Sequence, residues 1–123
     1  MYSTTLRDHA LHPRNRREME NRDAAGESKF PRCGDKLKLY FRFDGDLVSE
    51  VSFIGSACGP VIAAASLATT MLKGRTLEQA RGLGVYELHE ALGGLPASKR
   101  HAILLVLECL AEALGARPNP NQT

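Results

Sequence analysis

A period-two pattern in residues 36–53 constrains the fold more than any other feature of the chain, because it predicts a β-hairpin with one apolar face. The first strand alternates apolar and polar side chains; its apolar members are Leu37, Leu39, Phe41 and Phe43, and its polar-face members are Lys36, Lys38, Tyr40 and Arg42. Asp44-Gly45-Asp46 supplies the turn, where glycine takes a positive φ without strain. Leu47, Val51 and Phe53 are expected to continue the core face on the second strand.

Helical patterns follow the hairpin. Residues 60–72 are apolar nearly all round and begin with Pro60, which predicts a buried helix ended by Gly74. Shorter helices are expected over residues 76–81, with Thr76 as N-cap, and over residues 85–92. Residues 98–114 have helical spacing, with Gly115 as C-cap.

The N-terminal quarter predicts less regular structure. Residues 2–11 form a short helix that ends before Pro13, and residues 14–26 form a solvated connector containing either a turn of helix or a short strand. Strands that precede helices, without a βαβ alternation, indicate an α+β fold.

The composition indicates one small globular domain. The chain has 123 residues, a formal net charge of +2 and three cysteines. We expect a single domain over residues 1–115 and a flexible C-terminal tail over 116–123. The low charge gives no sign of a nucleic-acid partner. The longest apolar stretch, residues 61–72, is too short to span a membrane, and no signal peptide is visible, so a cytoplasmic location without a membrane partner is expected. An odd, low cysteine count is typical of a reducing compartment.

Cys33 and Asp35 lie two positions apart at the start of the predicted hairpin, so on a strand both side chains would point to the same side. A thiolate and a carboxylate could then meet at one metal ion, and Gly34 leaves room beside the backbone. The alternative interpretation is a tight turn with an incidental cysteine.

Cys58 stands at the start of the apolar helix, where free N–H groups and the helix dipole stabilise a thiolate. The alternative is a half-buried structural cysteine, although such cysteines usually lie inside elements rather than at glycine-flanked helix entries. We therefore interpret Cys58 as a functional thiol. Cys109 lies among apolar residues of the last helix and is expected in the core.

A histidine at a helix start is more often a surface or capping residue than a ligand. His101 occupies such a place in the first turn of the last helix. His9, His12 and His89 are given the same structural interpretation.

Three stretches resemble one known family. They are Cys33-Gly34-Asp35, the run from Gly55 through Cys58-Gly59-Pro60 to Ser66 with Lys73-Gly74-Arg75-Thr76 after it, and Leu95-Pro96-x-x-Lys99. The opening Tyr2-Ser3, Asp8-His9 and His12-Pro13-Arg14-Asn15 is also similar. Over about residues 2–115 the chain resembles the IscU/NifU-type iron–sulfur cluster assembly scaffolds.

The resemblance implies a small antiparallel β-sheet with helices packed on one side. It also implies a scaffold that accepts sulfur from a cysteine desulfurase, gathers iron, holds a labile [2Fe–2S] cluster and transfers it to acceptor proteins. Cys33 and Cys58 match the first two cluster ligands, Asp35 matches the aspartate that keeps the cluster labile, and His101 matches the histidine beside the third cysteine.

The chain departs from the family pattern at three places, one of which is the loop Arg14-Asn15-Arg16-Arg17, where the family usually has a glycine nearby. Ala102 stands where the third cysteine is expected, and Cys109 lies seven residues further on, a rise of about 10.5 Å along a helix. The predicted site is therefore Cys33, Asp35, Cys58 and His101. The family's chaperone-docking segment Leu-Pro-Pro-Val-Lys is here Leu95-Pro96-Ala97-Ser98-Lys99, which weakens the case for a chaperone partner.

Four functions remain open on the sequence. The leading one is a cluster scaffold without catalytic turnover, rather than an enzyme. The second is a zinc-binding sulfur acceptor or activator of a cysteine desulfurase, with Cys58 receiving the persulfide, because two thiolates, an imidazole and a carboxylate also suit tetrahedral zinc. A thiol enzyme with Cys58 as nucleophile and a histidine base, and an interaction protein that has lost its metal, are the others.

Overall fold

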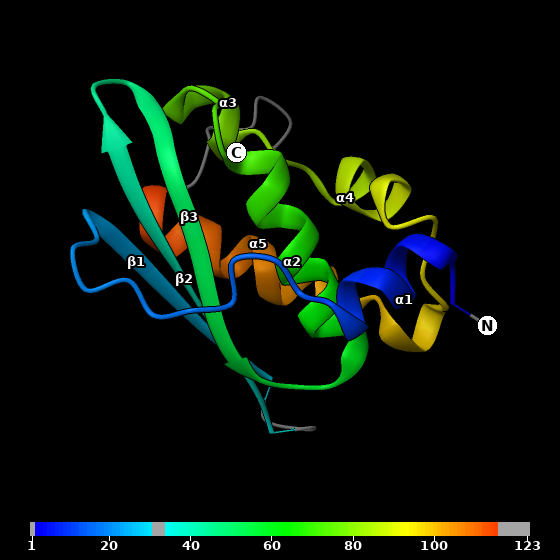
Figure 1. Ribbon diagram of the computed structural model, residues 1–123. Helices are drawn as coiled ribbons and strands as arrows, with labels where there is room; N and C mark the ends of the chain where they lie inside the picture. Colours follow the sequence, from blue (N-terminus) through cyan, green and yellow to red (C-terminus); the bar gives the residue numbers. More distant parts are fainter. Residues whose placement is uncertain (1, 31–33, 116–123) are drawn as a thin grey trace, which may run out of the picture.

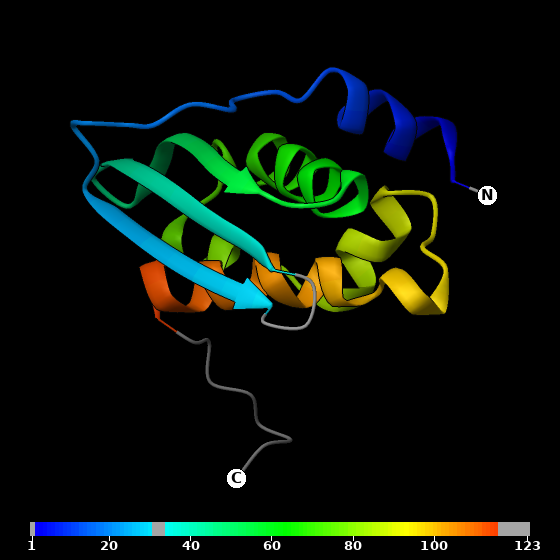
Figure 2. The ribbon, with the colours of Figure 1, turned by 90° about the horizontal axis from the view of Figure 1, so that it is seen from below.

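The computed structural model, described here for residues 2–30 and 34–115, is an α+β fold in which the helices lie together on one side of a small sheet (Figures 1 and 2). The three strands form an antiparallel sheet in the order β1-β2-β3. Their bounds are β1 Ala24–Phe30, β2 Asp35–Asp44 and β3 Leu47–Ser56. The helices are α1 Thr4–Leu11, α2 Gly59–Leu72, α3 Leu77–Arg81, α4 Val85–Ala91 and α5 His101–Leu114, with a short 3-10 turn, Ala97–Lys99, before α5. The predicted fold class is confirmed.

Two sequence predictions concern residues 31–33 and 116–123, which lie outside the described residues. These are the position of Cys33 and the flexible tail. Within residues 2–30 and 34–115, no helix combines the length and apolar character that crossing a membrane requires.

The hairpin of β2 and β3 is confirmed, but the prediction that Leu47 faces the core is wrong. Leu47 is 46% exposed, whereas its neighbour Val48 is fully buried. The pairing shifts between Arg42 and Phe43, which oppose Glu50 and Val48, so Ser49 is an extra residue on β3. Because one extra residue inverts the alternation of side chains, Val48 shares the core face with Val51.

The sequence predicts a connector over residues 14–26 that contains either a turn of helix or a short strand. The observed strand, β1, begins at Ala24 and continues beyond this connector to Phe30. Its core-facing positions hold Gly26 and Ser28 rather than large apolar residues, and both are buried. A Cβ added at Gly26 would lie 2.0 Å from the backbone oxygen of Cys109, so the strand and α5 are in close backbone contact. Small residues are required at this contact, and they remove the apolar alternation by which strands are recognised in a sequence.

Helix α2 packs in the core as predicted. Ala63, Ala64, Ala65 and Ala68 are fully buried, so the helix can approach its neighbours closely on several sides. The buried polar side chains of α2, Ser66 and Thr69, form hydrogen bonds with the N-terminal segment. Ser66 Oγ lies 2.7 Å from His9 Nδ1 on α1 and accepts the backbone N–H of Arg14, and Asn15 Nδ2 donates to Thr69 Oγ1. α1 is therefore fastened to α2 by hydrogen bonds as well as by apolar contact.

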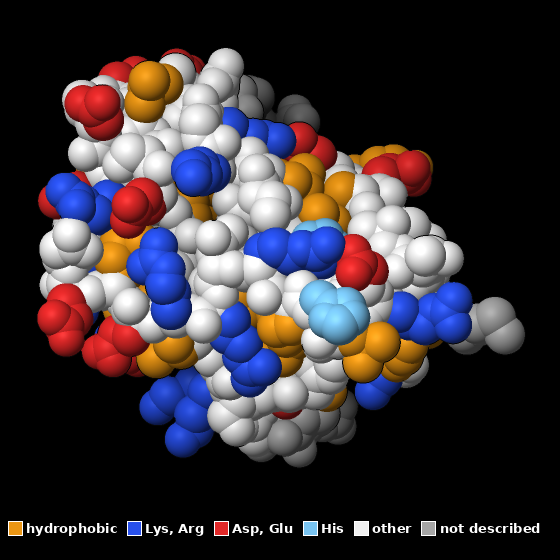
Figure 3. Space-filling view, viewed as in Figure 1, with side chains coloured by type: hydrophobic (Ala, Val, Ile, Leu, Met, Phe, Trp, Pro, Cys, Tyr) orange, Lys and Arg blue, Asp and Glu red, His pale blue; other side chains and the backbone are white. Residues whose placement is uncertain are grey.

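The segment between α1 and β1 crosses the face of the sheet remote from the helices. Arg16 pairs with Phe53 at one edge, and the N–H of Asp23 donates to the Phe41 carbonyl towards the other edge. Met19 and Tyr40 are each only 1% exposed beneath this crossing. Figure 3 shows lysine and arginine side chains on the left of the view, over the strands and this segment. The outer face of the sheet is therefore partly covered, and its remaining surface is rich in basic side chains.

The helix ends also follow the sequence. Thr76 caps α3 in a capping box with Gln79, and Gly115 ends α5 with a φ of 87°. The region predicted as one helix from residue 98 begins instead with the 3-10 turn, so α5 proper starts at His101.

The close contact at Gly26 yields a stability prediction. Gly26→Ala should lower the free energy of unfolding by about 3 kcal/mol or more, because the new methyl group would overlap backbone atoms that cannot turn away. Gly59→Ala is the matched control, since a Cβ there meets only Ala10 Cβ at 3.8 Å. Urea unfolding of the two variants measures the difference, and equal stabilities would contradict the packing described.

The buried His9 predicts loss of stability in acid. Burial, followed by the charge of Arg14, lowers the pKa of His9 below its usual 6.5, so the unfolded chain takes up its proton first. Stability from His9 is present above about pH 6.5 and is lost as the pH falls, by at most about 1.4 kcal/mol per unit. His9→Gln should flatten this dependence in denaturant unfolding measured between neutral and acid pH. His12→Gln, at an exposed position of the same segment, should retain the dependence.

Candidate metal centre

Three of the predicted site residues meet at one end of the sheet. Asp35 is the first residue of β2, Cys58 immediately precedes α2, and His101 is the first residue of α5. One potential ligand atom from each lies within 4.8 Å of the other two. Residues from distant parts of the sequence are therefore brought together where three elements begin.

The Asp35 carboxylate lies at the centre of this group. Its Oδ1 accepts the backbone N–H of Cys58 at 3.2 Å, while its Oδ2 lies 3.9 Å from Cys58 Sγ and 3.4 Å from His101 Nε2. Asp35 is 5% exposed, and Cys58 and His101 are half-buried. A buried carboxylate is thus paired with a thiol and an imidazole that solvent still reaches.

These spacings suit a shared metal ion. Metal–ligand bonds of about 2.0–2.3 Å place tetrahedral ligands about 3.5 Å apart, close to the two separations measured from Asp35 Oδ2. Thiolate, imidazole and carboxylate are all accepted by zinc and by iron. The three side chains can therefore hold one ion after small rotations, with one tetrahedral position left for a further ligand.

Phe30 orients the imidazole, and the sequence analysis missed it. The rings of Phe30 and His101 stack with centroids 4.6 Å apart and planes inclined by 20°. Phe30 ends β1 directly opposite Asp35 in the sheet register. A prediction of β1 at its full length would place this aromatic ring beside the site. The small residues of the strand prevent that prediction, because they give no apolar alternation.

Cys109 lies in the core, as predicted. It is fully buried, and its Sγ donates to the Leu37 carbonyl at 3.3 Å. Burial, together with the nearby Glu112 and Glu108, raises the pKa of Cys109 to about 12. Cys109 is not part of the group formed by Asp35, Cys58 and His101.

The neighbour of His101 adds no donor either. Ala102 is fully buried in the apolar core. The role predicted for Cys33 stays a prediction, because that residue lies outside the described residues. His9 has the structural contacts given above, and His12 is exposed.

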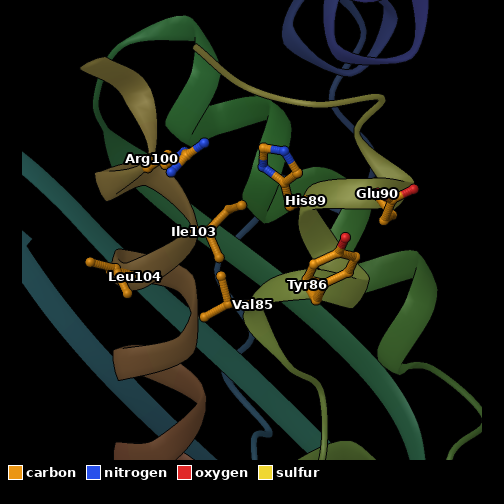
Figure 4. A pocket seen from close by; sticks show the side chains of 7 residues that line it. All are labelled: Val85, Tyr86, His89, Glu90, Arg100, Ile103 and Leu104. Atoms are coloured by element: carbon orange, nitrogen blue, oxygen red, sulfur yellow. The ribbon is translucent and has the colours of Figure 1, made fainter. Parts of the chain in front are cut away.

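A separate hollow of about 450 Å³ lies between α4 and the start of α5 (Figure 4). Its lining combines apolar side chains with a few charged or polar ones; these residues are Val85, Tyr86, His89, Glu90, Arg100, Ile103 and Leu104. None of the three clustered ligand residues lines it. His89 therefore belongs to a different surface from His101.

Comparison with known proteins gives one consistent result. A family model described as the NifU-like N terminal domain matches residues 1–122. The iron–sulfur cluster assembly scaffold protein IscU 1 of Archaeoglobus fulgidus is 36% identical over 114 residues, which are 93% of this chain and 74% of the relative. The IscU scaffold protein of Aquifex aeolicus is 35% identical over 115 residues, 92% of this chain and 73% of the relative.

Solved structures share the fold. A putative iron–sulfur cluster assembly scaffold protein for the SUF system from Fervidobacterium islandicum superposes with a TM-score of 0.76 at 24% identity, covering 92% of this chain and 96% of its own. The N-terminal part of a NifU-like protein from Brucella abortus gives a TM-score of 0.74 at 16% identity, covering 91% and 90%. At these identities the likeness concerns the fold alone.

The contrast between buried and accessible thiols can be measured. In the folded protein Cys109 should resist iodoacetamide at pH 8, because a pKa of about 12 leaves about one thiolate in ten thousand and the side chain is enclosed. Cys58 should react, since it is half-buried. Mass spectrometry of the digested protein reads both sites, and labelling in urea shows that Cys109 is competent when exposed. Rapid labelling of Cys109 without denaturant would contradict its place in the core.

Proposed function

The chain belongs to the family of NifU-like N-terminal domains, and on this basis we propose that it is an iron–sulfur cluster assembly scaffold. Its cargo is a labile [2Fe–2S] cluster, assembled on the chain and transferred to acceptor proteins. The observation that carries the proposal is the convergence of Asp35, Cys58 and His101 within 4.8 Å at one end of the sheet.

The donor set suits transient binding of iron and sulfide. The proposed ligands are Cys58, His101 and Asp35, together with Cys33. Cys58 and His101 are half-buried, so cargo held between them stays within reach of a second protein. The Asp35 oxygen is a harder ligand than a thiolate and binds a cluster less firmly, which favours release.

Cys58 is also the proposed sulfur acceptor. The Cys58 thiolate would attack the outer sulfur of a persulfide on a cysteine desulfurase, form the new S–S bond and release the desulfurase cysteine as a thiolate. The backbone N–H of Cys58 donates to Asp35, which holds the start of α2 beside the carboxylate. The chain would bind and transfer its cargo without catalytic turnover. A cytoplasmic location, the desulfurase and the acceptor proteins stay predictions.

A second candidate function is a zinc-bound sulfur acceptor or desulfurase activator. It is favoured by Ala102, because the position after His101 offers no thiolate, and by the burial of Cys109. Among the described residues the site then has one thiolate, one imidazole and one carboxylate, a set that zinc accepts in tetrahedral geometry.

Anaerobic reconstitution with ferrous iron and sulfide tests the scaffold function. We expect the visible absorption of a [2Fe–2S] cluster in the unaltered protein and its loss in Cys58→Ala. Cys109→Ala is the matched control: it also removes one thiol, but from the core, and should keep the absorption in protein that remains folded. Absorption that survives Cys58→Ala unchanged would refute the ligand assignment.

Metal content separates the two functions. About one zinc per chain in protein purified under air, absence of a chromophore after reconstitution and stimulation of a cysteine desulfurase would favour the zinc-bound acceptor. A chromophore with stoichiometric sulfide would favour the scaffold.

A further inference from the structure

The outer face of the sheet carries two rows of side chains that point away from the helices. The pairing register places Lys29, Lys36 and Ser56 across one row, and Glu27, Lys38 and Ile54 across the next. Residues directly opposite each other on antiparallel strands lie on the same face, with Cβ atoms about 5 Å apart. Lys29 and Lys36 are therefore immediate neighbours.

These two lysines repel each other without local compensation. Both are exposed, and within the part of the chain that the structure describes no carboxylate lies within 4.0 Å of either ammonium group. Lys38 differs, because it lies 4.0 Å from Glu27 and over the ring of Tyr40. Like charges opposite each other destabilise a sheet, so the Lys29–Lys36 pair does not serve the stability of the isolated domain.

A hollow of about 400 Å³ lies between the cations. Lys29, Lys36, Lys38 and the 36% exposed Ile54 line it, and most of its lining is apolar. Glu27 also lines it, but its carboxylate is paired with Lys38 at 4.0 Å. At the β3 edge Arg16 donates from Nη2 to the Gly55 carbonyl at 3.2 Å, which holds another cation beside the hollow. On the left of Figure 3, over the strands, basic side chains lie among apolar and acidic ones. We call Arg16, Lys29, Lys36, Lys38 and Ile54 the basic sheet face.

We propose that the basic sheet face binds an acidic segment of a partner protein, with an apolar side chain of that segment seated against Ile54. Carboxylates on both sides of the apolar side chain would neutralise the Lys29–Lys36 pair and meet Arg16. A peptide of this composition complements a face on which cations outnumber the one paired carboxylate and an apolar side chain lies between them. Charges at the rim of an interface steer the encounter, and the apolar centre is desolvated.

Other anionic partners fit this face less well. Duplex nucleic acid needs cations spread along a phosphate backbone, whereas these surround one small hollow on a chain whose net charge is only +2. An anionic membrane surface favours a protruding apolar face flanked by cations, whereas Ile54 lies within a hollow.

The face adjoins the metal centre. Lys36 follows Asp35 in β2, and Ser56, which also lines the hollow, precedes Cys58 by two residues. A partner bound here would lie beside the place where cargo is held. That link rests on the proposed function, whereas binding of the acidic segment does not.

Binding is tested with the metal-free full chain and a fluorescent peptide, Glu-Glu-Leu-Glu-Glu, at low ionic strength. We expect saturable binding by anisotropy, weakened by salt, and amide NMR shifts concentrated in residues 27–29, 36–38 and 54–56. Lys29→Gln/Lys36→Gln should raise the Kd about tenfold. Arg7→Gln/Lys73→Gln removes the same charge from exposed positions elsewhere and should change it less than about twofold.

Two further readouts complete the test. The melting temperature of Lys29→Gln/Lys36→Gln should stay the same or rise, because repulsion is relieved; a fall would make the lysines structural and overturn the proposal. Replacing leucine by serine in the peptide should also weaken binding. Absence of binding, equal losses in both double variants, or tighter binding of a DNA oligonucleotide or of anionic phosphatidylserine vesicles than of the peptide would overturn it. None of these measurements involves a cluster, so failure here is distinct from failure of reconstitution.

Discussion

The position of the metal-ligand side chains depends on the close contact between β1 and α5. At Gly26 the strand backbone meets the carbonyl of Cys109, and Ser28 donates to Glu108 at 2.8 Å further along. These contacts set the position of α5 along the strand. Its first residue, His101, consequently stacks on Phe30, at the end of β1. A larger side chain at Gly26 would move the helix away from the sheet and the imidazole away from Asp35.

The metal centre is a second consequence of this packing. Three elements begin at the same end of the sheet, and each contributes its first side chain or, for α2, the one just before it. Asp35 joins two of these starts through its contacts with Cys58 and His101. The core-facing side of the same helix α5 holds Cys109 as a neutral thiol. Among the described residues, burial therefore separates an enclosed thiol, Cys109, from a partly accessible one, Cys58.

Where the sequence analysis failed, the failures have physical reasons. Strict alternation places Leu47 in the core, but a bulge at Ser49 puts Val48 there instead. The sequence pattern does not predict the full length of β1, because its buried positions hold Gly26 and Ser28. These small residues fit the nearby helix backbone and give no apolar periodicity. Both cases depend on how one element contacts another, which local patterns do not contain.

The sequence by itself determined the hairpin, the helices, their caps, the α+β class and, through a resemblance to a known family, the expectation that Cys33, Asp35, Cys58 and His101 form one site. The secondary structure follows from periodicity and from turn and cap residues, which are local properties of the chain. The site follows from the motifs that the chain shares with the family. Only the tertiary structure decided that the three side chains meet, that Phe30 orients His101, and that Lys29 faces Lys36 beside a hollow. Those facts depend on strand register and on the distance of closest approach between backbones, because both are set by contacts between residues far apart in the chain.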